Sequence, residues 1–202
     1  LSGETIDYGP CAFMEAYDPK TVFSSIDQHG RYAFGNQPAI AQWNLARLAE
    51  ALLALIDEDR DRAAQKAMEV LNAFPAQYQT DLLRGQRAKF GLRRSEHDDD
   101  AVDAALAADW LALLQAGQVD FTLGWRRLSD AAAGDETPLR ALFADAKAPD
   151  EWLARWRERC AGEDPGAGEK RGADRNQIPT SDERAQAMRR VNPFVIPRNH
   201  RV

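Results

Sequence analysis

QPAIAQWNLARLAEALLALI, residues 37–56, is the stretch that decides the fold class, because its apolar side chains recur at three- and four-residue steps. This spacing predicts one apolar stripe along an α-helix. Pro38 is tolerated in the first turn, and Asn36 is a candidate N-cap. We expect this helix to lie in the core of a mostly α protein, with Asn44 as a buried amide that binds the preceding loop. The stripe consists of Ile40, Trp43, Leu48, Ala51, Leu52 and Leu55.

Helical patterns continue toward the C-terminus. Gly91 is a candidate C-cap, Asp120 is a candidate N-cap, and Thr180 with Glu183 forms a capping box for the final helix. Pro75 is expected to end or kink the helix that contains it. The sequence therefore predicts a succession of helices at residues 64–74, 78–90, 102–114, 121–132, 139–143, 150–160 and 180–191.

Aromatic, basic and acidic clusters in these segments are each open to two interpretations. Trp152 and Trp156 lie one turn apart, and we expect them to fill a core rather than to stack on an adenine. His97 precedes Asp98–Asp100, which we expect to begin a helix rather than to bind a metal. The densest basic patch is expected to be a solvated helix face, the alternative being a site for an acidic partner or a phosphate. It consists of Arg84, Arg87, Lys89, Arg93 and Arg94.

The composition narrows the range of partners. The chain has 202 residues, a net charge of −6 and a pI near 5.2, so no nucleic-acid partner is expected. The longest uninterrupted apolar run, residues 51–56, is too short to cross a bilayer, so no membrane partner is expected either. The two cysteines, Cys11 and Cys160, lack a metal-ligand spacing and predict reduced thiols in a cytoplasmic protein.

The N-terminal stretch Thr5-Ile6-Asp7-Tyr8-Gly9-Pro10 combines an extended lead, one carboxylate and a turn. An acid at the end of a strand can bind Mg²⁺ together with the phosphates of a substrate. The same residues also fit ordinary turn chemistry, in which Asp7 accepts hydrogen bonds from its own backbone. Both interpretations of Asp7 follow from the residues alone.

Residues 11–37 predict a long irregular loop, because they carry turn-forming residues and only short apolar patches. A loop of this length is either functional or a structured connector. His29 has no partner at a diagnostic spacing and is expected at the surface. Arg31 and Tyr32 either contact a phosphate or a protein substrate, or anchor the loop.

Three stretches, residues 5–19, 30–38 and 43–49, closely resemble the selenoprotein O family, and the resemblance extends more loosely through most of the chain. Members of this family resemble protein kinases in fold but transfer AMP from ATP to protein hydroxyls. By this resemblance Asp7 stands where protein kinases carry the aspartate of Asp-Phe-Gly, and it binds both the nucleotide and a Mg²⁺ or Mn²⁺ ion. The looser matches are Phe121-Thr122, Arg126-Arg127-Leu128-Ser129, the helix of Trp152 and Trp156, Asn192-Pro193 and Pro197-Arg198-Asn199.

The resemblance also implies what this chain lacks. The family's nucleotide loop, its lysine and glutamate, and its catalytic Asp-Asn pair would lie upstream of Leu1, so we expect no catalytic residue here. The chain then looks like the C-terminal part of a protein adenylyltransferase acting on Ser, Thr or Tyr, inactive alone and able to self-associate through an uncovered surface. Some relatives are thought to be redox-regulated, which makes a Cys11–Cys160 bridge conceivable. The alternatives are a non-enzymatic α-helical interaction module derived from a degenerate kinase lobe, and a genuine protein kinase.

The expected organisation has four parts. Residues 1–37 form the Asp-Tyr-Gly turn and an activation-segment-like loop, and residues 38–160 form the helical, kinase-like C-lobe. Residues 161–179, rich in Gly and charged residues, form a mobile linker. Residues 180–202 form a C-terminal helix and tail.

Overall fold

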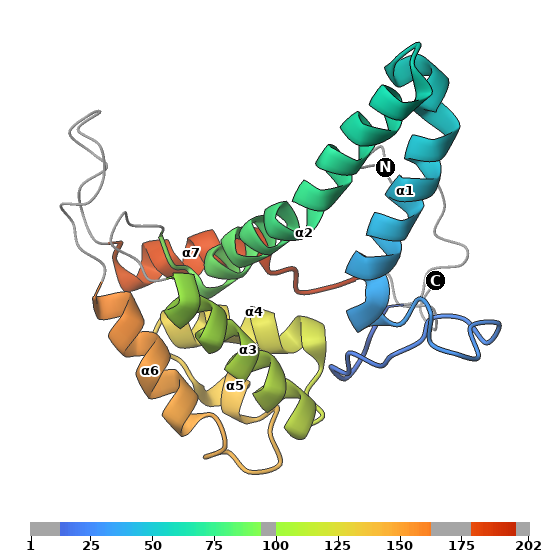
Figure 1. Cartoon of the computed structure of the whole chain (residues 1–202). Coiled ribbons are helices and arrows are strands. Elements are labelled where there is room, and N and C mark those ends of the chain that lie inside the picture. Colours follow the sequence, from blue (N-terminus) through green and yellow to red (C-terminus); the bar gives the residue numbers. More distant parts are fainter. Residues whose placement is uncertain (1–12, 94–99, 163–178, 197–202) are drawn as a thin grey trace, which may run out of the picture. The chain divides into compact units, whose positions relative to one another are not determined.

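The computed structural model describes residues 13–93, 100–162 and 179–196. Within these ranges the chain is helical, and its only β pairing is a single antiparallel bridge between Ala16 and Asp120 (Figure 1). The mostly α expectation is confirmed, while the strand or turn expected at the start lies outside the described residues. The helices are η1 (Phe34–Asn36, 3₁₀), α1 (Gln37–Ile56), α2 (Arg60–Phe90), α3 (Asp100–Ala116), α4 (Phe121–Ala132), α5 (Thr137–Arg140), α6 (Asp150–Ala161) and α7 (Ser181–Val191).

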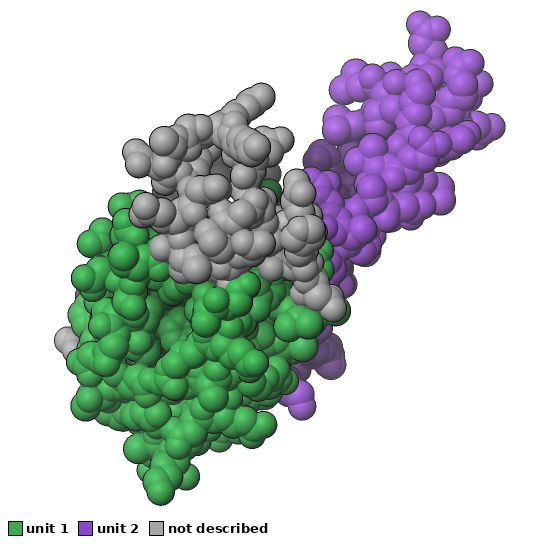
Figure 2. Space-filling model, turned by 90° about the vertical axis from the view of Figure 1, so that its left-hand side faces the viewer, with its two compact units in different colours: residues 1–18, 83–202 green, residues 19–82 purple. Residues whose placement is uncertain are grey.

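Two compact units divide the chain (Figure 2). The larger contains residues 1–18 and 83–202, and the smaller contains residues 19–82. The helix α2 is continuous through Pro75, so of the two expected effects of this proline the end of a helix is wrong, and a kink stays a prediction. Its residues up to Leu82 belong to the smaller unit, and those from Leu83 belong to the larger one.

The larger unit is built around a cluster of aromatic rings. Trp110 and Trp152 have their ring centroids 4.5 Å apart, and Phe90 lies 4.9 Å from Trp125. Trp152 donates its indole N–H to the carbonyl of Leu106 at 2.9 Å, and Trp156 donates to the carbonyl of Phe90 at 3.0 Å. These bonds satisfy both buried indoles and attach α6 to α3 and to α2. The prediction that the tryptophans of α6 fill a core is confirmed.

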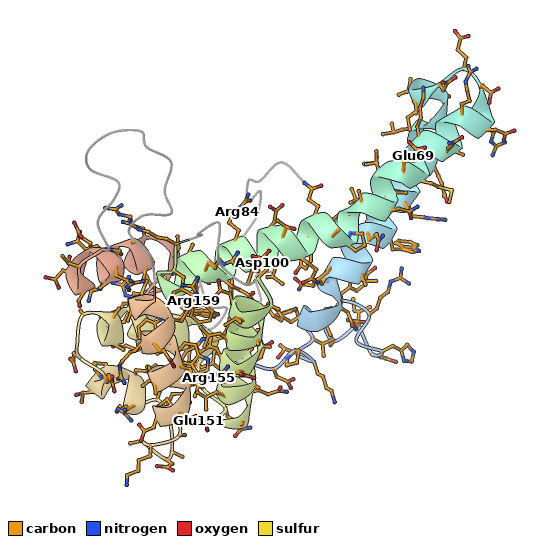
Figure 3. All side chains as sticks on the ribbon, turned by 60° about the vertical axis from the view of Figure 1, so that its left-hand side comes forward. Glu69, Arg84, Asp100, Glu151, Arg155 and Arg159 are labelled. Atoms are coloured by element: carbon orange, nitrogen blue, oxygen red, sulfur yellow. The ribbon has the colours of Figure 1, made fainter. Side chains whose placement is uncertain are left out.

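A buried ion cluster connects the same three helices. Asp103 of α3 is 1% exposed, and its carboxylate accepts from Arg87 Nε at 2.6 Å and from Arg159 Nε at 2.7 Å. Two members of the cluster, Asp100 and Arg159, are labelled in Figure 3. Arg87 also donates to Asp100 at 2.7 Å. The sequence-based expectation of a solvated basic face is therefore wrong for Arg87. Helical spacing identifies a basic residue near a helix end but does not show that an acidic helix covers it.

The final helix α7 packs on α4 and is capped as predicted. Thr180 and Glu183 form the reciprocal capping box. Arg184, almost fully buried, donates to the carbonyls of Gly91 and Cys160 at 2.5 and 3.3 Å. Asn192 ends the helix and donates from its side chain to the carbonyl of Lys89 at 2.9 Å. The Lys89 ammonium donates to the Asn192 side-chain oxygen, and burial lowers the pKa of this lysine.

The smaller unit is a hairpin of α1 and α2, and it corrects the expectation of a core helix at residues 37–56. No residue of α1 is buried, and Trp43, Leu48 and Leu55 are 46%, 53% and 83% exposed. Asn44 is exposed as well, so the buried amide expected there is wrong. Asn36 occupies the N-cap position without a side-chain capping bond. Its side-chain amide donates to the carbonyl of Gly30. The apolar stripe is real, but the described residues do not cover it.

Of the described residues, one helical stretch, Phe34–Ile56, is long and apolar enough to cross a membrane. Core helices of water-soluble proteins and signal sequences share this length and composition, so the property does not identify a membrane span.

Replacing Gly91 by alanine should destabilise the larger unit. Gly91 ends α2 with φ +69°, and a Cβ there would lie 2.7 Å from Arg184 Cγ and 2.8 Å from Met188 Cγ. We expect Gly91→Ala to lower the free energy of unfolding by about 2 kcal/mol, measured by denaturant titration. Gly85→Ala is the matched control, since no atom lies within 4 Å of its added Cβ. It should stabilise α2 by about 0.5–1 kcal/mol, and equal effects of the two changes would contradict the packing described.

Asp103→Asn should be far more damaging than the same change at Asp109. The first change leaves two arginines without their shared carboxylate in the interior and should cost about 3 kcal/mol. Asp109 also pairs with an arginine of α6, Arg155, at 2.7 Å, but both side chains are about half exposed. Asp109→Asn should therefore change the unfolding free energy by less than about 1 kcal/mol. Thermal and denaturant unfolding of both variants measures the difference, and similar losses would show that the burial of Asp103 is unimportant.

Candidate functional site

The candidate metal-binding acid, Asp7, lies outside the described residues, as does Cys11. The structure therefore leaves the role of Asp7 a prediction, and it leaves pairing between Cys11 and Cys160 untested. It does describe the chain from Phe13 onward, beginning six residues after Asp7. The functional site is accordingly approached from the segment that follows the acid.

Residues 13–18 are anchored to the start of α4. Tyr17 donates its backbone N–H to the carbonyl of Val119 at 3.0 Å, and Phe121 donates to the carbonyl of Glu15 at 2.7 Å. The Tyr17 ring stacks on Phe121 at a centroid distance of 5.2 Å. Tyr17 is 8% exposed, and burial together with the nearby Asp18 charge raises the pKa of its hydroxyl. Backbone and side chain thus hold this segment on the larger unit.

Residues 19–36 form the irregular loop that the sequence predicts, apart from the 3₁₀ turn η1 at its end. The base of the loop is closed by Gly35, which donates to the carbonyl of Pro19 at 2.8 Å. Its tip is organised by Asp27, whose two carboxylate oxygens accept from the backbone N–H groups of Arg31 and Tyr32, each at 2.8 Å. The loop is therefore a defined turn system rather than an extended connector.

Cation–π contacts connect the loop to α1. The Arg31 guanidinium lies 4.5 Å from the ring centroid of Trp43, and the Arg47 guanidinium lies 5.5 Å from it. Arg47 also forms an ion pair with Glu50. These contacts favour the loop-anchoring role of Arg31 over direct ligand binding. Tyr32 remains 51% exposed, and His29 is exposed as predicted.

The metal-ligand inventory of the described residues is small. In residues 13–93, 100–162 and 179–196, no group of three or more His, Cys, Asp or Glu side chains is arranged to hold a metal ion. A site made only of these protein ligands is therefore not present in this part of the chain. One carboxylate combined with phosphate oxygens of a nucleotide is a donor set that Mg²⁺ accepts, and Asp7 is chemically suited to supply it.

The sequence does not reveal the roles of two residues that organise this region. Asp27 is one of the turn-forming residues of the loop, and aspartate commonly accepts backbone hydrogen bonds in turns. Trp43 belongs to the predicted apolar stripe, but its ring contacts Arg31 of the loop. Neither the partner of an aspartate nor the partner of an exposed tryptophan can be identified from spacing alone.

Comparisons with known proteins match the whole chain. A family model described as "Protein adenylyltransferase SelO" covers residues 1–202. A protein nucleotidyltransferase YdiU of Rhizobium etli is 53% identical over 204 residues, which is 100% of this chain and 37% of that relative. The YdiU proteins of a Bradyrhizobium species and of Cereibacter sphaeroides are also 53% identical, over 38% and 37% of their lengths. The chain thus spans little more than a third of the curated relatives that it matches.

Asp27→Ala should open the loop. The change removes the acceptors of the Arg31 N–H and of the Tyr32 N–H, and the second of these belongs to the peptide bond between Arg31 and Tyr32. We expect trypsin to cleave after Arg31 at least about five times faster, because local opening controls cleavage in folded proteins. Asp27→Asn keeps one acceptor oxygen and should give an intermediate rate. Peptide mass spectrometry measures the rate of cleavage after Arg31. An unchanged rate in Asp27→Ala would show that Asp27 does not hold the turn.

Proposed function

The chain belongs to the SelO family of protein adenylyltransferases, and we propose from this premise that it is the C-terminal part of an enzyme that transfers AMP from ATP to proteins. The observation that carries the proposal is the family match over all 202 residues. The acceptors we propose are Ser, Thr and Tyr hydroxyls, the compartment is the cytoplasm, and the fold of the whole enzyme is kinase-like. Nucleotidyl transfer is also what the names of the relatives state.

The reaction is a substitution at the α-phosphorus of ATP. The acceptor hydroxyl oxygen forms a bond to the α-phosphorus, the bond from that phosphorus to the bridging oxygen breaks, and pyrophosphate leaves. The hydroxyl proton passes to a base, which we assign to the part of the enzyme outside this chain. Transfers of this kind depend mainly on positioning and on neutralising phosphate charge.

Asp7 is the residue of this chain that we assign to the reaction. Its carboxylate would bind Mg²⁺ or Mn²⁺ beside the phosphates, and a bound ion supplies charge neutralisation there. The anchored segment of residues 13–18 supports this role, because it fixes the chain shortly after the acid. The exposed loop of residues 19–36 is the part that we assign to contact with the protein substrate. Because the chain alone lacks the rest of the enzyme, we propose that it is inactive and self-associates in isolation.

A labelling experiment on the full-length gene product tests AMP transfer. The protein is incubated with ATP labelled at either the α- or the γ-phosphate, and label in protein is counted. We expect α-label only, and we expect Asp7→Ala to reduce it at least about a hundredfold, since a ligand to the nucleotide's ion is lost. Asp61→Ala, at the exposed start of α2, is the matched control and should retain activity.

The remaining outcomes contradict the proposal in different ways. Label from the γ-phosphate would identify a protein kinase, and no label from either position would favour an interaction module. Equal α-label incorporation by Asp7→Ala would support AMP transfer but would show that Asp7 is not needed for it. Light scattering of the 202-residue chain separately tests self-association, for which a purely monomeric mass at all concentrations would be the contrary result.

A further inference from the structure

The hairpin of α1 and α2 carries an apolar surface that its own residues leave open. Between residues 37 and 82 the only buried apolar side chain is Ala63. Large apolar side chains of both helices are instead well exposed, which is unusual for a contiguous region and marks a contact surface. They are Trp43, Leu45, Leu48, Leu52, Leu55, Ile56, Met68, Val70 and Leu82.

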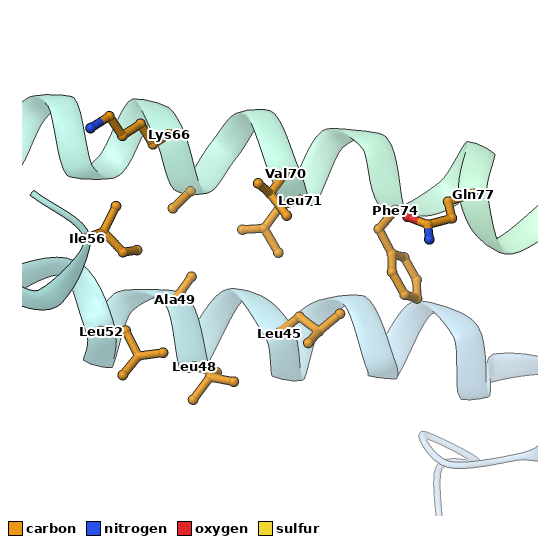
Figure 4. A pocket seen from close by; sticks show the side chains of 11 residues that line it. Leu45, Leu48, Ala49, Leu52, Ile56, Lys66, Val70, Leu71, Phe74 and Gln77 are labelled. Atoms are coloured by element: carbon orange, nitrogen blue, oxygen red, sulfur yellow. The ribbon is translucent and has the colours of Figure 1, made fainter. Parts of the chain in front are cut away.

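The centre of this surface is an apolar groove of about 370 Å³ (Figure 4). Nine of its eleven lining side chains are apolar, and the other two are Lys66 and Gln77. Lys66 is already paired with Asp57 at 2.8 Å, so it does not call for an anionic ligand. Such a lining suits apolar side chains and offers little to a polar small molecule. The α1 part of the lining is Leu45, Leu48, Ala49, Leu52 and Ile56, and the α2 part is Lys66, Ala67, Val70, Leu71, Phe74 and Gln77.

The length of the relatives indicates what covers the groove. All of this chain matches the YdiU proteins, yet it accounts for only 37–38% of their length. In such a protein the remaining, larger part of the polypeptide is covalently linked to the hairpin. Its effective concentration at the groove is therefore high. A groove between two helices accepts the ridge of a third helix, with apolar anchors one turn apart.

The charges on the hairpin disfavour a bilayer as the occupant. Arg47 and Glu50 form an ion pair in the middle of α1, with side chains 52% and 56% exposed. Arg62 and Lys66 both pair with Asp57 at the turn between the helices. If α1 crossed a bilayer, Arg47 and Glu50 in its middle would have to enter the hydrocarbon.

We propose that the α1–α2 groove is a docking surface for an apolar helix from the part of the polypeptide outside these 202 residues. The contact explains why a helix with a strong apolar stripe has no buried residue in this chain. The inference rests on the family to which the chain belongs and on the greater length of its relatives. It holds whether or not AMP is the group transferred.

Cysteine labelling in the full-length gene product tests the proposal. Leu48→Cys and Val70→Cys place a thiol on the groove, one on each helix, and Glu50→Cys and Glu69→Cys are matched controls outside its lining. Maleimide modification of each site is followed by peptide mass spectrometry, so Cys11 and Cys160 do not interfere. In the full-length protein we expect the groove thiols to react at least about tenfold more slowly than the controls. In the dilute 202-residue chain all four should react at similar rates.

Four results would overturn the proposal. Equal labelling of groove and control sites in the full-length protein would show an open groove. Protection that disappears on dilution of that protein would identify a second copy as the occupant, and protection that requires lipid vesicles would identify a membrane. A gene product with the mass of the 202-residue chain alone would remove the proposed occupant. Circular dichroism of each variant checks that protection does not come from misfolding.

Discussion

The larger unit depends on the carboxylate of Asp103, which is buried between two arginines. Removing an ionised group from water costs several kcal/mol unless partners replace the lost solvation. Here Arg87 of α2 and Arg159 of α6 supply those partners, so the charge is satisfied only when three helices are assembled together. The two indole N–H bonds of Trp152 and Trp156 tie the same three helices through backbone carbonyls. These polar groups each have specific partners, so they fix the relative positions of α2, α3 and α6. Apolar contacts between aromatic rings alone would allow several such positions.

The sequence predicts helix-capping interactions correctly where the interacting residues lie within one helical turn of each other. The capping box of Thr180 and Glu183, the cap of Asp120 and the C-terminal glycine of α2 each depend on residues a few positions apart, and each is confirmed. The identity of Arg87 as a core residue was not readable, because its partners lie 13 and 16 positions away on another helix. Of the candidate site, the loop and the exposure of His29 were predicted, whereas Asp7 lies outside the described residues.

The misassigned helix α1 shows a different limit of sequence reasoning. Apolar periodicity reports that one face of a helix will avoid water, but it carries no information about what provides the cover. In α3 and α6 the cover is present, and residues such as Leu106 and Leu153 are buried. In α1 the same kind of stripe remains open. The stripe itself does not distinguish the two cases.

The two units also differ in how they are stabilised. Residues 13–18 are bound to the start of α4 by backbone hydrogen bonds, and Leu83–Phe90 of α2 belong to the same larger unit. Of the described residues, the smaller unit contains most of the exposed large apolar side chains, although Phe13, Val102 and Phe194 of the larger unit are also exposed. The larger unit thus buries its apolar side chains around an ionised and aromatic core, whereas the smaller unit leaves most of its own exposed.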